Sequence, residues 1–212
     1  VEVIGNVVPQ YEEQADLRRE KEKYKIVFVG RMVRNHKRPH LLIGAFAKIA
    51  AEFPDWTLEL WGAEDNKRYQ KELQRIIDSA GLTKRILFCG TTKNVASVLQ
   101  NADLYTMPSA YEGFGLSLAE GMSMGLPAVG YQNCVAVNEL IHDGENGFLA
   151  DDGVEPLAEK MALLMRDRDL RVKMGMAARE SMRVYAPENI WAQWEELMRN
   201  VVLRTISEQR RR

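Results

Sequence analysis

Short apolar runs recur along the chain, and a glycine or a polar loop follows most of them. The clearest runs cover 26–29, 57–61, 86–89, 104–107 and 127–130. Runs this short, bounded by turn residues, are typical of strands buried on both faces of a parallel sheet. We therefore expect a strand at each of them, and a further short strand at Phe148 and Leu149.

Amphipathic segments separate these runs. Pro39 opens one segment with apolar residues at helical spacing, and Gly81 is placed to end another. The pattern predicts helices over 39–50, 65–80, 94–100, a stretch through Met124, 137–141, 154–166, 168–184 and 188–206. Strands that alternate with helices predict an α/β fold, a Rossmann-like parallel sheet with helices on both faces and right-handed crossovers.

Ligands of such sheets bind beyond the carboxyl ends of the strands. The loops after Val29, Cys89 and Met107 are therefore expected to face one crevice. The third loop is rich in glycine: Pro108 to Phe114 leads through Gly115 into an expected helix. A helix that starts at glycines presents free backbone N–H groups and the positive end of its dipole, so we expect an anion there.

Composition narrows the classes of function. The 212 residues are 46% hydrophobic, which fits one large domain rather than two. The 29 basic and 30 acidic residues give a net charge of −1, which disfavours a nucleic-acid partner. Two cysteines, Cys89 and Cys134, exclude a disulfide framework and favour a cytoplasmic location. No apolar run is long enough to span a membrane, so we expect at most peripheral contact with its inner face.

Positive charge is concentrated between residues 31 and 40, where Arg31, Arg34, Lys37 and Arg38 lie with two of the three histidines. From the crevice rim, Arg31 and Lys37 could reach two oxygens of a diphosphate. For Arg34, Arg38 and His40 we expect solvated side chains. The charged segment 11–23 is expected to be a solvated spacer or a short exposed helix.

Glu112 and Glu120 lie eight residues apart, about 80° around a helix, so they can share a site only if Glu112 stands on the loop and Glu120 in the helix. Carboxylates beside a phosphate are suited to accept hydrogen bonds from sugar hydroxyls. The alternative is that Glu112 caps the helix and Glu120 is a surface residue. Asp151 and Asp152 lack the spacing of a metal-binding motif, and we expect a turn there and no metal.

These residues resemble, in order and spacing, the nucleotide-sugar-binding half of retaining glycosyltransferases of family 4, which have the GT-B fold. The resemblance covers residue 25 to the end. Its most specific part is the pair Glu112 and Glu120 with Arg31 and Lys37 upstream. Supporting segments are Gly30-Arg31, Pro108-Ser109, Glu112-Gly-Phe-Gly-Leu116, Gly125-Leu-Pro127, Asn138-Glu-Leu-Ile141, Asp143-Gly144 and Asn146-Gly-Phe-Leu149.

The resemblance implies roles for single residues. Arg31, Lys37 and Glu112 would be catalytic, the two cations holding the diphosphate as it leaves and Glu112 lying near the donor sugar. Glu120 would bind the ribose hydroxyls, and Gly90 and Thr91 the base. The complete set of implied substrate-binding residues is Gly30, Gly90, Thr91, Gly113, Phe114, Gly115, Leu116 and Glu120, with no cofactor apart from the nucleotide-sugar substrate.

Two departures from the family pattern are visible. The segment Tyr131–Val137 stands where relatives often have small residues, which bears on the fit of the donor sugar. Arg38 follows Lys37 where a glycine is common. The chain also begins at Val1 without an initiator methionine, which we interpret as the start of an excised domain. Residues 1–24 are expected to be an interdomain segment with a charged spacer, 25–186 the Rossmann-like domain, and 187–212 a helix returning toward the absent N-terminal, acceptor-binding half.

The leading hypothesis is a hexosyltransferase-type enzyme of cell-envelope polysaccharide biosynthesis. It would transfer a sugar from a nucleotide-sugar, expected to be a UDP-sugar, to a glycan or lipid-linked acceptor, and this chain alone would be inactive. One alternative is a non-catalytic nucleotide-sugar-binding module of a multi-subunit assembly. The other is half of a nucleotide-sugar epimerase.

Overall fold

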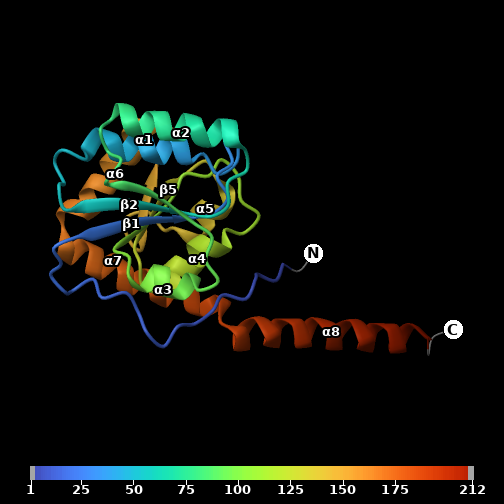
Figure 1. Ribbon diagram of the computed structural model, residues 1–212. Helices are drawn as coiled ribbons and strands as arrows, with labels where there is room; N and C mark the ends of the chain where they lie inside the picture. Colours follow the sequence, from blue (N-terminus) through green and yellow to red (C-terminus); the bar gives the residue numbers. More distant parts are fainter. Residues whose placement is uncertain (1–2, 210–212) are drawn as a thin grey trace.

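A computed structural model of the chain shows a six-stranded parallel sheet between two layers of helices (Figure 1). The structure describes residues 3–209, with the side chains of the last helix described as far as Val202. The strands are β1 (Tyr24–Val29), β2 (Trp56–Trp61), β3 (Ile86–Gly90), β4 (Leu104–Met107), β5 (Ala128–Tyr131) and β6 (Gly147–Ala150). Their order across the sheet is β3-β2-β1-β4-β5-β6.

The helices follow the amphipathic segments closely. They are α1 (Pro39–Ile49), α2 (Lys67–Ser79), α3 (Val95–Gln100), α4 (Leu116–Ser123), α5 (Val135–Leu140), α6 (Val154–Arg166), α7 (Arg168–Ser181), the 3-10 turn η1 (Met182–Tyr185) and α8 (Pro187–Gln209). Gly81 directly follows the C-cap residue of α2 and has φ 68°, a left-handed conformation that glycine commonly adopts at the end of a helix. The predicted α/β fold is confirmed.

Two hydrophobic clusters fill the space on either face of the sheet. One joins the sheet to α1, α2 and α6, and includes Phe28, Phe46 and Trp56. The other joins it to α4, α5 and α7, and includes Tyr105 and Met122. These two layers appear above and below the sheet in Figure 1. Both faces of the sheet are thus covered, which explains why its strands are nearly continuous apolar runs.

The strand order reverses between β1 and β4. The chain proceeds from β1 outward to β3, then returns to the other side of β1 with β4. At such a switch point the two neighbouring strand-to-helix loops diverge to opposite faces and leave a crevice at the carboxyl edge. The loops that follow Val29 and Met107 border this crevice, and they carry the basic residues and the glycine turn.

The charged segment 11–23 is not the spacer we expected. Ala15 and Leu17 are 8% and 6% exposed, and the Ala15 N–H donates to the Met124 carbonyl at 2.9 Å. Lys21 pairs with the buried Asp103 at 2.7 Å. Two apolar side chains and a few specific contacts therefore fasten an otherwise charged, non-helical segment to the domain.

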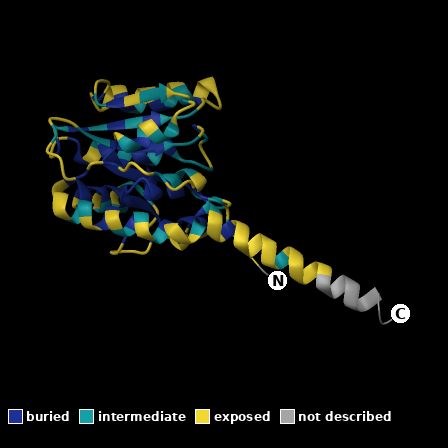
Figure 2. Ribbon diagram, turned by 90° about the horizontal axis from the view of Figure 1, so that it is seen from below, coloured by how far each residue is buried: buried dark blue, intermediate teal, exposed yellow. Residues whose placement is uncertain are grey.

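Helix α8 extends away from the domain, and most of its described surface is exposed (Figures 1 and 2). The exposed side chains include Trp191, Trp194 and Met198. The N-terminal segment meets the chain just before this helix, where the Val8 N–H donates to the Tyr185 carbonyl at 2.9 Å. No helix in the described part of the chain is long and apolar enough to cross a membrane. The basic residues 210–212 lie outside the described residues.

Candidate functional site

The loop after β1 brings a lysine back over the end of the strand. The N–H groups of Lys37 and Arg38 both donate to the Val33 carbonyl, at 3.1 and 3.0 Å, which closes a tight turn. A side chain at Gly30 would come within 3.5 Å of the Lys37 Cδ and 2.9 Å of the Phe28 ring. Glycine at this position therefore leaves room for the lysine stem over the carboxyl end of β1.

Lys37 meets Glu112 across the crevice. Its Nζ lies 2.5 Å from Glu112 Oε1, and the two side chains are 16% and 8% exposed. The buried Ser109 hydroxyl donates to the same Oε1 at 2.5 Å. Because both donors converge on one carboxylate oxygen, Oε2 of Glu112 is the oxygen available to another hydrogen-bond donor.

The glycine turn leads into α4 without a side-chain cap. Gly115 is the N-cap residue, has φ 82° in the left-handed region, and offers no side chain to the first N–H groups. Gly113 and Leu116 are exposed beside it. The start of α4 therefore presents backbone donors and the positive end of the helix dipole toward the crevice.

Glu112 stands on the loop and Glu120 within α4, the arrangement in which the two can share a site. Gly115 occupies the cap position, so the alternative in which Glu112 caps the helix is wrong. Glu120 is half-buried, and burial raises the pKa of its carboxyl group. Burial also raises the pKa of Tyr11, and the charge of Glu120 contributes to that rise. Tyr11, from the N-terminal segment, packs against the hydrophobic cluster that includes α4.

The six basic or histidine residues of the loop have different surroundings. Arg31 is exposed, and its side chain has no ion pair or hydrogen bond to any described residue. Arg34 pairs with Glu72 of α2 and lies 4.7 Å from the centre of the Tyr69 ring. Among these cations, Arg31 and Lys37 are therefore the ones whose groups face the crevice or remain free to meet a ligand.

Two expectations for this loop are wrong. Arg38 is not solvated: its side chain is 13% exposed and its guanidinium bonds to Pro108, Ser109 and Asp152. His40 is half-buried, and its Nδ1 lies 2.7 Å from the Tyr69 hydroxyl. Burial lowers the pKa of His40, and the charges of Arg34 and Arg38 lower it further. Partners from distant segments, which local composition does not show, account for both differences.

Gly90 ends β3, two strands from β1, and Thr91 follows it; both are exposed. The Gly62 N–H donates to the Gly90 carbonyl at 2.7 Å, and the Gly30 N–H donates to the Trp61 carbonyl at 2.8 Å. The ends of the first three strands are thus joined in one row. Gly90 and Thr91 form the far end of the same edge, apart from the ion pair of Lys37 and Glu112.

The segment after β5 is bound to the turn after β6. Gln132 donates to Asp151, and Asn133 Nδ2 donates to Asp152 at 3.4 Å. Cys134 lies near Glu112, whose charge contributes to the rise in the Cys134 thiol pKa that burial causes. Tyr131 to Cys134 therefore border the site beside Glu112, where the sequence departs from the family pattern.

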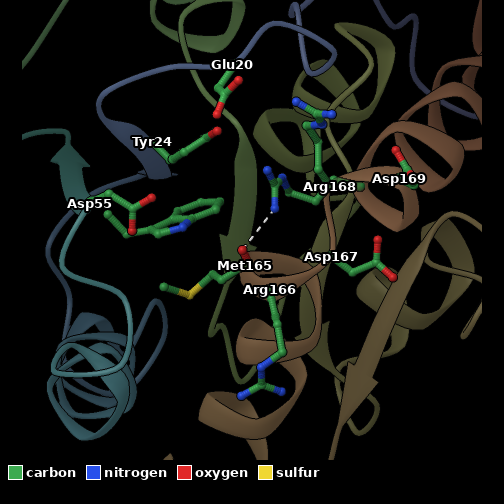
Figure 3. Close-up of a pocket in the computed structure, with 10 residues that line it drawn as sticks. Glu20, Tyr24, Asp55, Met165, Arg166, Asp167, Arg168 and Asp169 are labelled. Atoms are coloured by element: carbon green, nitrogen blue, oxygen red, sulfur yellow. Dashed lines mark hydrogen bonds between the residues drawn. The ribbon is translucent and has the colours of Figure 1, made fainter.

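A pocket of about 660 Å³ lies at the opposite end of the sheet, where β1 and β2 begin (Figure 3). Asp55, Asp167 and Asp169 surround it, and Arg166 and Arg168 point away from each other in the close-up. Acidic and basic side chains alternate around this pocket. In the described residues no group of three or more His, Cys, Asp or Glu side chains could hold a metal ion.

Sequence reasoning did not identify the contacts that Ser109 and Arg38 make at this edge. Ser109 lies three residues before Glu112, a spacing at which a loop hydroxyl can reach a carboxylate, and this was the available signal. The contacts of Arg38 carried no such signal, because its partners lie 70 to 114 residues away in the chain.

Comparison with known proteins identifies the family of the chain. Residues 9–181 match the family model described as "Glycosyl transferases group 1". The chain is 31% identical over 175 residues to a poly(glycerol-phosphate) alpha-glucosyltransferase of Bacillus subtilis, covering 82% of this chain and 25% of that protein. It is 34% identical over 171 residues to an N-acetyl-alpha-D-glucosaminyl L-malate synthase of Bacillus anthracis, covering 80% and 44%. The chain thus spans between a quarter and a half of these curated relatives.

Solved structures give the same result. The C-terminal domain of a glycosyl transferase group 1 family protein (LpcC) from Francisella tularensis superposes with a TM-score of 0.75 at 27% identity, covering 85% of this chain and 97% of that domain. The Anabaena protein Alr3699/HepE, solved with UDP and glucose, superposes with a TM-score of 0.76 at 26% identity, covering 84% of this chain and 48% of that protein.

Proposed function

The chain belongs to the group 1 glycosyltransferases, family 4, with the fold of a GT-B C-terminal domain, and we propose that it binds the donor of a retaining glycosyltransferase. The observation that carries the proposal is the ion pair of Lys37 and Glu112 beside the uncapped start of α4. A cation, a carboxylate and free amides within one crevice suit a ligand with both phosphates and hydroxyls.

The diphosphate of the donor would bind between the two loops. Lys37 would contact it from the β1 end, Arg31 from the rim, and the N–H groups of Gly113 to Leu116 from the start of α4. Transfer requires the diphosphate to leave as the anomeric bond stretches, and preorganised cations and amides stabilise the charge that develops. This arrangement supplies that stabilisation from the protein's own residues.

The sugars would bind through the two carboxylates. Oε2 of Glu112 is free to accept a hydroxyl of the donor sugar while Oε1 stays on Lys37 and Ser109. Glu120, farther along α4, would accept from the ribose hydroxyls, and Gly90 with Thr91 would contact the base. UDP is the expected nucleotide, because the similar Anabaena protein was solved with UDP and with UDP-glucose.

The acceptor would be a glycan or a lipid-linked sugar held by an N-terminal half. In this proposal residues 1–24 join the halves, residues 25–186 bind the donor, and the helix from 187 returns toward the N-terminal half. The exposed Trp191, Trp194 and Met198 support that last point, since an apolar helix face is suited to packing on another domain. We expect donor binding without transfer from the 212-residue chain.

A calorimetric titration of the chain with UDP, GDP and ADP tests the proposal. We expect UDP to bind and Lys37→Ala to weaken it by about 1.5–3 kcal/mol, because a contact to a charged group is lost. Lys173→Ala, an exposed lysine on α7, is the matched control and should leave the affinity unchanged. If none of the three nucleotides binds at millimolar concentration, the proposed function is wrong.

A further inference from the structure

We propose that Arg38 is a positioning residue of the donor site, one that holds the loop carrying Ser109 and Glu112 in the conformation that places Glu112 on Lys37. The inference deepens the proposed function and rests on it. Arg38 touches neither Lys37 nor Glu112 through the contacts described below. Its effect passes through the backbone of Pro108 and Ser109.

The backbone of Arg38 is the first sign of a special role. Among the residues that the structure describes, it is the single non-glycine residue with positive φ, at φ 47° and ψ 44°. A long side chain in the left-handed region is strained, and glycine would adopt the same backbone freely. Such strain persists where surrounding contacts compensate for it. The side chain of Arg38 should therefore supply contacts that glycine could not.

Those contacts converge on the loop before α4. The Arg38 Nε donates to the Pro108 carbonyl at 2.9 Å and one terminal nitrogen donates to the Ser109 carbonyl at 3.3 Å. The other terminal nitrogen donates to both carboxylate oxygens of Asp152, at 2.8 and 2.9 Å. The guanidinium carbon also lies 4.7 Å from the centre of the Tyr131 ring. The planar fork of arginine meets all of these partners at once, which lysine could not do.

The bonded carbonyls lie directly beside the site. Ser109, whose carbonyl Arg38 holds, donates its hydroxyl to Glu112 Oε1 at 2.5 Å. The Ala110 N–H donates to the His36 carbonyl at 2.8 Å, a second fastening between the same two loops. Arg38 and this backbone bond together fix the peptides on both sides of Ser109. The position of the Glu112 carboxylate is thereby tied to the turn that presents Lys37.

The anchor on the far side of Arg38 unites the two departures from the family pattern. Tyr131, whose ring lies under the guanidinium, begins the segment that lacks the usual small residues, and Asn133 of that segment donates to Asp152. An arginine in place of glycine is thus accompanied by an aromatic and a carboxylate that receive it. The two departures from the family pattern, Arg38 and the segment that begins at Tyr131, therefore form one set of contacts that borders the sugar side of the crevice.

The test uses Arg38→Gly, which removes the guanidinium and suits the left-handed backbone, so the variant should fold. Arg34→Gly is the matched control in the same loop, because Arg34 pairs with Glu72 on the other side. Hydrogen exchange of the ligand-free chain should show faster exchange for the amides of 109–115 in Arg38→Gly alone. Affinity for UDP-glucose should fall about tenfold, more than affinity for UDP, since Glu112 faces the sugar.

Restoring donor affinity with added guanidinium ion distinguishes a positioning role of Arg38 from a general effect of the substitution on stability. Millimolar guanidinium ion should restore UDP-glucose affinity to Arg38→Gly, because the vacated site keeps two carbonyls, a carboxylate and a ring. Unchanged exchange at 109–115, or a variant that binds UDP-glucose as tightly as the unsubstituted chain, would overturn the role of Arg38 while leaving the proposed function intact. An unsubstituted chain that binds no nucleotide would instead overturn the proposed function.

Discussion

Arg171 at the amino end of the parallel sheet and Lys37 at its carboxyl end are both largely covered, but their partners differ in kind. At the amino end, Arg171 is 2% exposed and donates to the carbonyls of Leu164 and Met165 at 2.7 and 3.0 Å. Its guanidinium carbon lies 5.1 Å from the centre of the Tyr24 ring and 5.0 Å from the centre of the Trp56 ring. At the carboxyl end, Lys37 pairs with the Glu112 carboxylate, and the exposed Arg31 has no ion pair or side-chain hydrogen bond to a described residue.

The difference lies in what a ligand could displace. Arg171 satisfies carbonyls at the end of α6, which have no other donor within the helix, so its donors serve the fold. Lys37 is paired with a loop carboxylate, and a phosphate could share or replace that partner. The pocket at the amino end is therefore a poor candidate for the donor site, although it is a sizeable hollow. The chemistry of the partners, rather than the volume, identifies the site.

Replacing Arg171 should have the largest effect and should act on stability alone. We expect Arg171→Leu to lower the free energy of unfolding by about 3 kcal/mol, because two buried carbonyls lose their donor and two rings lose a cation. UDP affinity should be unchanged. Urea unfolding and calorimetric titration of the same preparation measure both quantities.

The matched control is Arg168→Leu, an exposed arginine on the first turn of α7. It should leave both the unfolding free energy and the UDP affinity close to those of the unsubstituted chain. A loss of UDP affinity in Arg171→Leu, measured well below its unfolding transition, would break the comparison between the two ends of the sheet.

Replacing Arg31 should have the reverse effect, on binding alone. Its side chain contacts no described residue through an ion pair or hydrogen bond, so Arg31→Ala should leave the unfolding free energy unchanged. We expect it to weaken UDP by about 2 kcal/mol and UMP by less, because a diphosphate offers the second phosphate that Arg31 would reach. Titrations with both nucleotides check this.

Arg34→Ala serves as its control. Arg34 lies three residues later in the same loop but pairs with Glu72 and stacks on Tyr69. It should bind UDP as the unsubstituted chain does. Equal losses for UDP and UMP in Arg31→Ala would mean that Arg31 does not reach the second phosphate.

The fold of this chain could be predicted from sequence because its signals are local. Apolar runs, helical spacing and glycines at turns are properties of neighbouring residues, and the strands and helices follow them within a few positions. That Lys37 and Glu112 lie at one sheet edge could be expected for the same reason, but their ion pair and the hydrogen bond from Ser109 were not predicted. Local geometry also placed Glu112 and Glu120 on different elements.

The roles of Arg38 and Arg171 could not be predicted in this way. Each lies in a charged stretch that resembles a solvated surface, and each is buried by partners brought together only by the complete fold. Leu17 illustrates the same limit in the highly charged segment 11–23, where its buried side chain helps to fasten the backbone to the domain. Composition averages over such single residues and therefore hides them.

Glu120 should give a small effect on stability, and it sharpens the contrast from within the site. Burial raises its pKa above the ordinary 4.5, so the folded chain binds its proton more strongly than the unfolded chain does. The contribution of Glu120 to the free energy of unfolding is fully present below pH 4.5, and it is lost as the pH rises through the raised pKa of the folded chain. At neutral pH, Glu120→Gln should thus be more stable than the unsubstituted chain by roughly a few tenths of a kcal/mol, a small value because solvent screens a half-buried group. At pH 4 the two chains should be equally stable.

The same substitution should weaken UDP, because the ribose hydroxyls lose a charged acceptor, while 2′-deoxy-UDP should be affected less. Urea unfolding at two pH values and titration with both nucleotides measure these opposite changes. Replacing a group that serves the fold lowers the free energy of unfolding, as expected for Arg171. Replacing a group that is held in place for a ligand, as we expect for Glu120, raises the stability of the chain and weakens ligand binding. If Glu120→Gln and the unsubstituted chain bind UDP equally tightly, Glu120 is not part of the donor site.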